Sequence, residues 1–235
     1  MLKSQEWTLS RVGDAALVIE CEQRIDPDVN ARVLAVADTV RRLARPGVRD
    51  VVESYCGVMV HFDPLLTDTE VVISDLETEM ARTEQVIVGD SVGRELTIPV
   101  CYGGIDGPDL QAVAAFANCS ETEVIDRHAA TTYRVYMLGF LPGFAYMGSV
   151  PVSLAMPRRQ TPRLDVPAGS VGIAGRQTGV YPLDGPGGWQ LIGRTPVTLF
   201  DLDRADPFLF RPGDTVQFEP IAADRFDVIW SAGPR

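Results

Sequence analysis

The stretch VPAGSVGIAGRQTGVYPLDGPGGWQLIGRTP, residues 166–196, limits the fold more than any other part of this 235-residue chain. It contains eight glycines and four prolines. Because both residue types destabilise helix interiors, no helix of ordinary length fits between Leu141 and Thr195. Short strands joined by frequent turns are typical of a closed or nearly closed β-barrel. We therefore expect residues 91–235 to form a β-barrel domain.

The glycines of this stretch do not have the spacing of a nucleotide-binding loop. A Walker P-loop needs a lysine after its last glycine, and Lys3 is the only lysine of the chain. The G-x-G-x-x-G pattern is also absent, and the stretch opens no helix whose N-terminus could hold a phosphate. Two interpretations stay open. Either the glycines serve only the tight turns of a barrel, or the polar residues between them form a ligand platform.

The first ninety residues have a different pattern, in which strands and amphipathic helices alternate. Apolar residues three or four apart predict a helix that begins after Asp26, and a second helix is predicted over about 68–85. A hairpin with its turn near Gly57 lies between them. The order β, α, β, β, α, β is that of a split βαβ unit, so we expect a small ferredoxin-like domain over residues 1–90, with a hinge at 89–95. The expected fold class is thus α+β.

Two short helices are predicted between the hinge and the glycine-rich stretch, over 107–117 and 120–128. The second starts with the capping-box pattern of Ser120 and Glu123. It ends at His128, where the helix dipole favours a cation, so the sequence predicts a C-terminal cap. His61, on the hairpin, is interpreted as structural.

Composition excludes several classes of protein and of site. The net charge of −11, with no cluster of basic residues beyond short runs, argues against a nucleic-acid partner. No apolar run approaches the eighteen residues of a membrane span, and the N-terminus lacks a signal-peptide pattern, so the expected location is the cytoplasm. The four cysteines are far apart and no histidines have ligand spacing, so we expect no metal site.

Between the glycines lie polar and aromatic side chains that suit a binding site, in two similar groups. The first is Arg176-Gln177-Thr178 with Tyr181, and the second is Trp189-Gln190 with Arg194. Planar donors and acceptors on a sharp backbone could face a pocket, or they could line the outer face of the barrel. Asp165 and Asp184 are the nearby acids, and each could act as a base or orient an arginine.

Two further motifs precede this stretch. In LGFLPGFAYMGS, residues 138–149, Pro142-Gly143 predicts a type II turn. The aromatic residues around the turn either close the core or form the lip of a pocket. In MPRRQTPR, residues 156–163, prolines stiffen a run of three arginines. That run is either a solvated loop or a site for an anion or an acidic partner.

The motifs GFLPGFAYMG and PRRQTPRLDVPAGSVGIAGRQTGVYPLDGPGGWQLIGRTP, together with VCYGG and GPDL, strongly resemble the allophanate hydrolase subunit 1 family. The resemblance covers about residues 2–218. Arg176 departs from it, since a second glycine is expected there, and so does Asp184-Gly185, where a pair of small residues is more usual. The resemblance implies a cyclophilin-like β-barrel after a small N-terminal α+β domain.

Members of this family include the B subunit of the bacterial ATP-dependent 5-oxoprolinase and a sporulation kinase inhibitor. The resemblance therefore implies a protein, inactive alone, that acts with a paralogous barrel protein, the C subunit, and with an A subunit. Together they would open 5-oxo-L-proline to L-glutamate with ATP hydrolysis. ATP would be a co-substrate, with or without Mg²⁺, and no bound organic cofactor is expected. The alternatives are a urea amidolyase or allophanate hydrolase component, and a regulator that inhibits a sensor histidine kinase.

This chemistry needs groups that hold anions and orient an amide more than it needs a strong nucleophile. We expect a small-molecule site in which arginines bind carboxylate or phosphate, polar residues orient the substrate amide, and aromatic residues wall the pocket. The expected catalytic residues are Arg163, Gln177 and Tyr181, and the expected binding residues are Phe144, Arg158, Thr178, Trp189 and Arg194.

Overall fold

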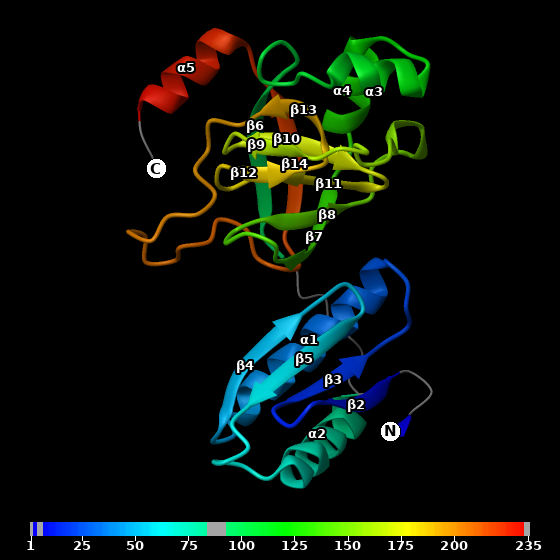
Figure 1. Ribbon diagram of the computed structural model, residues 1–235, viewed down its shortest axis with the longest axis vertical. Helices are drawn as coiled ribbons and strands as arrows, with labels where there is room; N and C mark the ends of the chain where they lie inside the picture. The colour runs from blue at the N-terminus through cyan, green and yellow to red at the C-terminus, as the bar shows by residue number, and fades with distance from the viewer. Residues whose placement is uncertain (1, 4–6, 84–92, 233–235) are drawn as a thin grey trace. The chain divides into compact units, whose positions relative to one another are not determined.

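A computed structural model describes residues 2–3, 7–83 and 93–232. The chain divides into two compact units, Met1–Val92 and Gly93–Arg235 (Figure 1). The boundary predicted from the sequence, between residues 90 and 91, lies outside the described residues.

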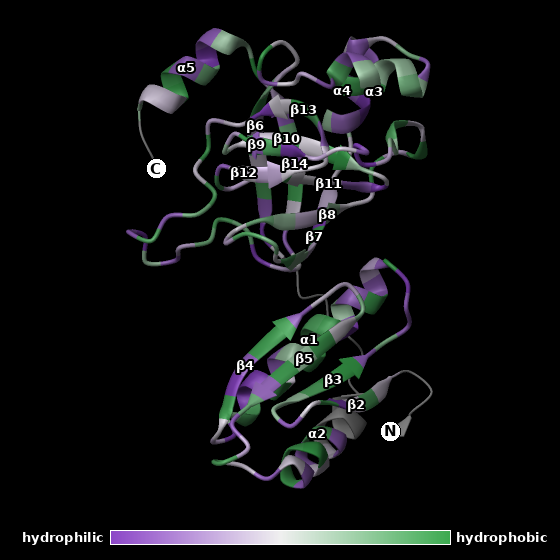
Figure 2. Cartoon of the chain, in the orientation of Figure 1, coloured by the Kyte–Doolittle hydropathy of each residue, from purple (hydrophilic) through white to green (hydrophobic). Residues whose placement is uncertain are grey.

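The first unit is an antiparallel sheet in the strand order β1-β2-β3-β5-β4, packed with two helices. Its core is apolar, and Figure 2 shows β3 and β5 coloured mainly as hydrophobic. The side chain of Asp26 accepts a hydrogen bond from the amide of Asp28 at 2.9 Å, which fixes the start of the first helix as predicted. The elements are β1 (Leu2–Lys3), β2 (Thr8–Val12), β3 (Ala16–Glu20), α1 (Pro27–Leu43), β4 (Val48–Glu53), β5 (Gly57–Phe62) and α2 (Thr69–Thr83).

The topology of this unit agrees with a split βαβ unit only in part. Strand β5 lies between β3 and β4 and is antiparallel to both, as that pattern requires. The other neighbour of β3 is β2, which precedes it in the chain. A ferredoxin-like sheet places there the strand that follows the second helix, and residues 84–92 lie outside the described part. The described residues thus form a mixed α/β unit, and the ferredoxin-like assignment stays a prediction.

The second unit contains a closed barrel in the order β10-β11-β8-β7-β14-β6-β13, which confirms the predicted β-barrel. Neighbouring strands are antiparallel except for β6 and β14, which are parallel. A two-stranded sheet of β9 and β12 accompanies the barrel (Figure 1). The barrel strands are β6 (Glu95–Tyr102), β7 (Tyr133–Leu138), β8 (Ala145–Gly148), β10 (Ser170–Ala174), β11 (Gln177–Val180), β13 (Gln190–Arg194) and β14 (Thr215–Pro220). The remaining elements are α3 (Leu110–Ala117), α4 (Glu121–Ala129), η1 (Val152–Leu154), β9 (Arg163–Val166), β12 (Gly185–Gly187) and α5 (Ala223–Ser231).

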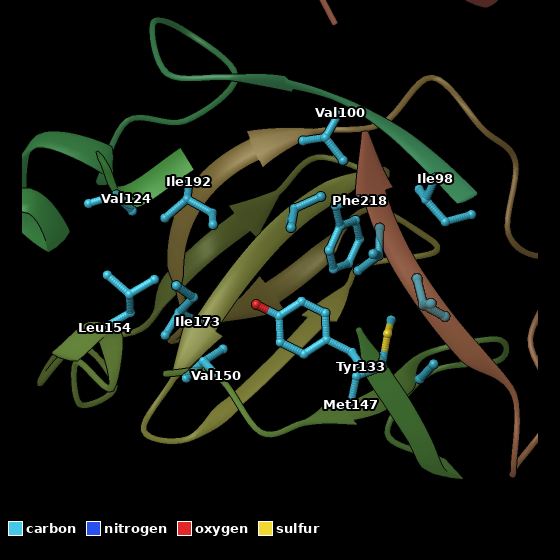
Figure 3. Close-up of a cluster of buried hydrophobic side chains, with 14 of the residues drawn as sticks. Ile98, Val100, Val124, Tyr133, Met147, Val150, Leu154, Ile173, Ile192 and Phe218 are labelled. Atoms are coloured by element: carbon cyan, nitrogen blue, oxygen red, sulfur yellow. The ribbon is translucent and has the colours of Figure 1, made fainter. Parts of the chain in front are cut away.

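Apolar side chains from nearly every strand fill the barrel. Figure 3 shows Tyr133, Ile173 and Phe218 pointing into the space that the strands enclose, and all three are buried. At one end, Val124 of α4 and Leu154 of η1 join the same core. The barrel is thus a packed core, and a ligand site on this unit must lie on its outside or at its ends.

The two short helices of this unit lie where the sequence predicts them. The capping box is present, since Ser120 accepts a hydrogen bond from the Glu123 amide and the Glu123 carboxylate accepts one from the Ser120 amide. Between residues 141 and 195 the helical structure is limited to the single turn η1, as the density of proline and glycine requires. Helix α5 has no counterpart among the predicted elements.

Candidate functional site

Four aromatic rings pack together beside the barrel wall, and we name them the aromatic cluster: Phe144, Tyr146, Tyr181 and Trp189. The ring of Phe144 is central, with its centroid 4.9 Å from Tyr146, 5.2 Å from Tyr181 and 5.4 Å from Trp189. All three contacts are edge-to-face, the arrangement that aromatic quadrupoles favour. The structure thus joins three of the predicted site residues with one, Tyr146, that the sequence analysis did not select.

Glycines make this packing possible. A Cβ atom on Gly179 would lie 3.1 Å from Trp189 and 3.2 Å from Phe144. A Cβ atom on Gly187 would lie only 2.3 Å from the hydroxyl oxygen of Tyr181. These two glycines are therefore needed for the close approach of aromatic rings to the backbone.

The turn before the cluster is the predicted type II turn. The amide of Phe144 donates to the carbonyl of Leu141 at 3.0 Å, and Gly143 has the positive φ of 82° that the third position requires. Phe144 is buried, so of the two interpretations of this motif, a closed core or the lip of a pocket, the first applies to this ring. Phe140, with φ of 69°, is 59% exposed and lies 5.6 Å from Phe144, centroid to centroid, so it extends the aromatic surface to solvent.

Tyr181 is almost completely buried in the cluster. Burial raises the pKa of its hydroxyl, although a hydrogen bond with the backbone of Trp189 opposes the shift. The pKa of Tyr146 is also raised by burial, and the positive charge of Arg158 opposes that shift. Both hydroxyls stay protonated at neutral pH, so they can serve as hydrogen-bond donors or acceptors but not as bases.

The arginine motif is divided between two environments. The guanidinium carbon of Arg158 lies 5.9 Å from the centroid of the Trp189 ring, in a cation–π contact. Arg159 and Arg163 instead form ion pairs with the buried carboxylate of Asp109, at 3.2 and 2.7 Å. Arg163, predicted to be catalytic, thus shares one carboxylate with Arg159, and its guanidinium also lies 3.5 Å from the carbonyl of Trp189 in the cluster.

Thr178 lies inside the barrel, apart from the aromatic cluster. Its hydroxyl donates to the carbonyl of Gly172 at 3.1 Å and contacts Nε2 of His128 at 2.9 Å. Because strand residues alternate in direction, Thr178 and its neighbour Gly179 face opposite sides of β11. Thr178 is fully buried, and its surroundings are those of a core residue.

His128 does not cap a helix, which corrects the prediction from the sequence. Its ring is completely buried, stacks on Phe218 with centroids 4.7 Å apart, and accepts a hydrogen bond at Nδ1 from the hydroxyl of Tyr102 at 2.8 Å. Burial lowers its pKa to about 3, so the imidazole is neutral at physiological pH. Since the one hydroxyl proton of Thr178 goes to Gly172, Nε2 of His128 must carry the proton that Thr178 accepts.

The remaining predicted residues lie at other places on the barrel. Gln177 is half-buried at the start of β11, opposite Gly148 of β8. Arg194 is at the end of β13, where its Nε donates to the carbonyl of Ala168 at 2.8 Å and its guanidinium lies over the Trp230 ring of α5 at 4.9 Å. Arg194 therefore stacks on the C-terminal helix and does not join the aromatic cluster.

The two candidate acids also have separate positions. The side chain of Asp184 accepts a hydrogen bond from the amide of Ala168 at 2.7 Å, so it stabilises a turn. Asp165 is exposed on β9. Within residues 2–3, 7–83 and 93–232, no group of three His, Cys, Asp or Glu side chains is placed to hold a metal ion. No helix in those residues is long and apolar enough to cross a membrane.

The residue that sequence reasoning missed is Asp109. It lies in the GPDL motif at the start of α3, some fifty positions before the arginines it pairs with. A carboxylate just before a helix is an ordinary N-cap candidate, so nothing local marks it as the partner of a distant loop. In the structure its side chain makes no capping bond and faces the arginines instead.

Comparison with known proteins supplies relatives over almost the whole chain. The chain is 40% identical over 227 residues to the B subunit of 5-oxoprolinase from Bacillus subtilis, and the match covers 92% of this chain and 93% of that protein. It is 43% identical over 210 residues to the protein of the same name from Escherichia coli O157:H7, and this match covers 89% of this chain and 94% of that protein.

Solved structures share the fold. The crystal structure of TTHA0988 matches with a TM-score of 0.79 and 36% identity, and the match covers 88% of this chain but only 40% of that longer one. The Kluyveromyces lactis urea amidolyase matches with a TM-score of 0.76 at 18% identity, over 96% of this chain and 15% of that one, which shows a common fold alone. Residues 7–210 match the family model described as carboxyltransferase domain, subdomain C and D, and the chain belongs to that family.

Proposed function

We propose that this chain is the B subunit of an ATP-dependent 5-oxoprolinase, a hydrolase that acts on a cyclic amide. The observation that carries the proposal is the group of relatives named as this subunit of 5-oxoprolinase, which are 40%, 43% and 46% identical over 92%, 89% and 72% of this chain. The fold proposed with this function is a cyclophilin-like barrel after a ferredoxin-like unit.

The name of these relatives implies an enzyme of several subunits. We assign the others to a paralogous barrel protein, the C subunit, and to an A subunit, and we expect the isolated chain to be inactive. The reaction opens the lactam of 5-oxo-L-proline to give L-glutamate and consumes ATP. An amide is a poor electrophile, and phosphorylation of its oxygen makes a better leaving group, so the complex must hold anions and admit the water that hydrolyses the activated amide.

The aromatic cluster with its neighbouring arginine is the part of this chain that best suits such a substrate. Apolar ring faces bind a small ring, and a guanidinium binds a carboxylate through two parallel hydrogen bonds. Arg158 lies over the buried ring of Trp189 and affects the pKa of Tyr146, so the half-buried ring of Tyr146 is the part of the cluster that a ligand beside Arg158 could contact. The amide-orienting role expected for Gln177 and the catalytic role expected for Arg163 and Tyr181 stay part of the proposal, whereas the buried hydrogen bonds of Thr178 argue against contact with substrate.

A second candidate is a component of the urea amidolyase type. A urea amidolyase from Lachancea kluyveri is 38% identical to this chain, but only over 64 residues, which are 25% of this chain and 4% of that protein. The match is shorter and covers far less than the matches to the 5-oxoprolinase relatives, so we rank this activity second.

The test is reconstitution. The chain is purified with its two partner proteins, and the conversion of 5-oxoproline to glutamate is measured with and without ATP and with each protein omitted in turn. We expect turnover only when ATP and all three proteins are present. Turnover of allophanate but not of 5-oxoproline would favour the second candidate. No turnover of either, combined with inhibition of a histidine kinase, would favour a regulatory protein.

A further inference from the structure

The loop of residues 156–163 carries three arginines, and two of them are paired with a carboxylate within the chain. Arg159 and Arg163 both donate to the same oxygen, Oδ1 of Asp109. Arg158 is exposed, and within the described part of the chain its guanidinium has neither an ion pair nor a hydrogen bond. Its charge is therefore uncompensated, beside the buried ring of Trp189 and the half-buried ring of Tyr146.

The backbone around Arg158 is fixed on both sides. The carbonyl of Pro157 accepts a hydrogen bond from the Gln190 side chain at 2.8 Å, and the amide of Arg159 donates to the carbonyl of Gly188 at 2.8 Å. Gly188 and Gln190 flank Trp189, so the segments that carry the guanidinium and the indole are tied to each other. A cation held this way loses less conformational freedom when it binds an anion.

Asp109 contributes to the same arrangement. Its side chain is 7% exposed, and besides the two arginines it accepts a hydrogen bond at Oδ2 from the amide of Leu191 at 2.7 Å. Its own amide donates to the carbonyl of Leu191 at 2.9 Å. One carboxylate thus joins the start of α3, strand β13 and the arginine loop, and its contacts are to residues that closely follow Arg158 and Trp189 in the chain.

We propose that Arg158 binds the carboxylate of a small ring-shaped ligand that lies against Tyr146, the half-buried ring of the aromatic cluster, and that Asp109 is a positioning residue that holds Arg158 over Trp189. One unpaired guanidinium matches the single charge of a carboxylate, and its planar fork matches the two oxygens. The inference rests on the proposed function, because 5-oxoproline carries one carboxylate on a small lactam ring. It assigns the carboxylate to Arg158 and removes Arg163 and Arg194 from that role.

The first test uses the emission of Trp189 in a Trp7→Phe, Trp230→Phe background, with 5-oxoproline and 2-pyrrolidinone as probes. The second probe is the same lactam without the carboxylate. We expect a saturable change in emission with 5-oxoproline, and binding at least about tenfold weaker for 2-pyrrolidinone and for Arg158→Ala. The affinity of Arg158→Lys for 5-oxoproline should lie between those of the unchanged protein and Arg158→Ala, since lysine keeps the charge and lacks the planar fork. Arg225→Ala, which removes an equal charge from the exposed face of α5, is the matched control and should bind normally.

The second test uses the assembled complex. Arg158→Ala should raise KM for 5-oxoproline about tenfold with KM for ATP unchanged, and Asp109→Asn should raise KM for 5-oxoproline by a smaller factor with kcat retained.

Unchanged KM in Arg158→Ala, or equal binding of the two lactams, overturns the inference while the proposed function stands. If the complex does not turn over 5-oxoproline, the proposed function fails, and the inference is then judged with acetate and inorganic phosphate as probes. A change in Trp189 emission with acetate that Arg158→Ala abolishes supports the inference. A change with phosphate alone, or with neither probe, overturns the inference.

Discussion

Replacement of Thr178 by valine separates a core role from a ligand-binding role for this residue. Valine has nearly the same shape but cannot accept the hydrogen bond from Nε2 of His128. The imidazole N–H would then lie in the barrel core without a partner, which costs about 1–3 kcal/mol. The added methyl group recovers about 0.8 kcal/mol by apolar burial, so we expect a net loss of about 1 kcal/mol in the free energy of unfolding. For a unit of this size, that lowers Tm by about 3 °C.

The assay is thermal unfolding of the purified chain, together with KM for 5-oxoproline in the reconstituted complex. Thr97→Val is the matched control, because Thr97 is exposed on β6 and the same change there should alter stability by less than about 0.5 kcal/mol. We expect Thr178→Val to melt earlier and to keep its KM at temperatures where it is folded. An unchanged Tm with a raised KM would show that Thr178 contacts the substrate, and our assignment of it to the core would be wrong.

Three further predictions concern single contacts. Below pH 6.5 the unfolded chain protonates His128 while the folded one, with a pKa of about 3, does not, so the free energy of unfolding should fall by up to about 1.4 kcal/mol per pH unit between those values. Urea unfolding at several pH values should show a weaker dependence of this free energy on pH in His128→Asn, and an equal dependence would contradict the burial argument. Gly187→Ala should lower the free energy of unfolding by about 1–3 kcal/mol through a clash with the Tyr181 hydroxyl, and thermal unfolding of the double variant with Tyr181→Phe should show part of the loss relieved. Arg194→Ala should lower stability by about 1 kcal/mol and speed hydrogen exchange in α5 without changing KM for 5-oxoproline, whereas a raised KM would return Arg194 to the binding site.

Much of the fold follows from local sequence. Proline and glycine density in residues 141–195 leaves only short strands, and the structure has a barrel there. The capping residues Asp26 and Ser120 begin helices where the sequence predicts. These features depend on contacts between residues a few positions apart, so one sequence contains the information for them. The pairing of β2 with β3 is also local, since only residues 13–15 separate the two strands. The parallel pairing of β6 with β14, by contrast, joins strands far apart in the chain, and local pattern does not decide it.

Within the candidate site, the structure brings together the predicted residues that are aromatic and separates Thr178 from them, because the position of Thr178 depends on the direction of a strand. Phe144, Tyr181 and Trp189 are large aromatic residues near glycines, and they do form one cluster. The sequence pattern places Thr178 in one polar group with Gln177, yet adjacent strand residues face opposite sides of the strand. Without the register of β11 against β8 and β10, the sequence does not tell which of the two faces the core.

The arginines show why charge in a sequence is a weak guide to an anion site. Each arginine of the motif has the same side chain and the same nearby prolines, so local chemistry does not rank Arg158 above Arg163. The ranking comes from Asp109, because this buried carboxylate must be paired, and its Oδ1 accepts hydrogen bonds from Arg159 and Arg163 but not from Arg158. What a ligand can use is the charge left over after internal pairing. That remainder is a property of the folded chain, which is why a distant aspartate decides which arginine can bind substrate.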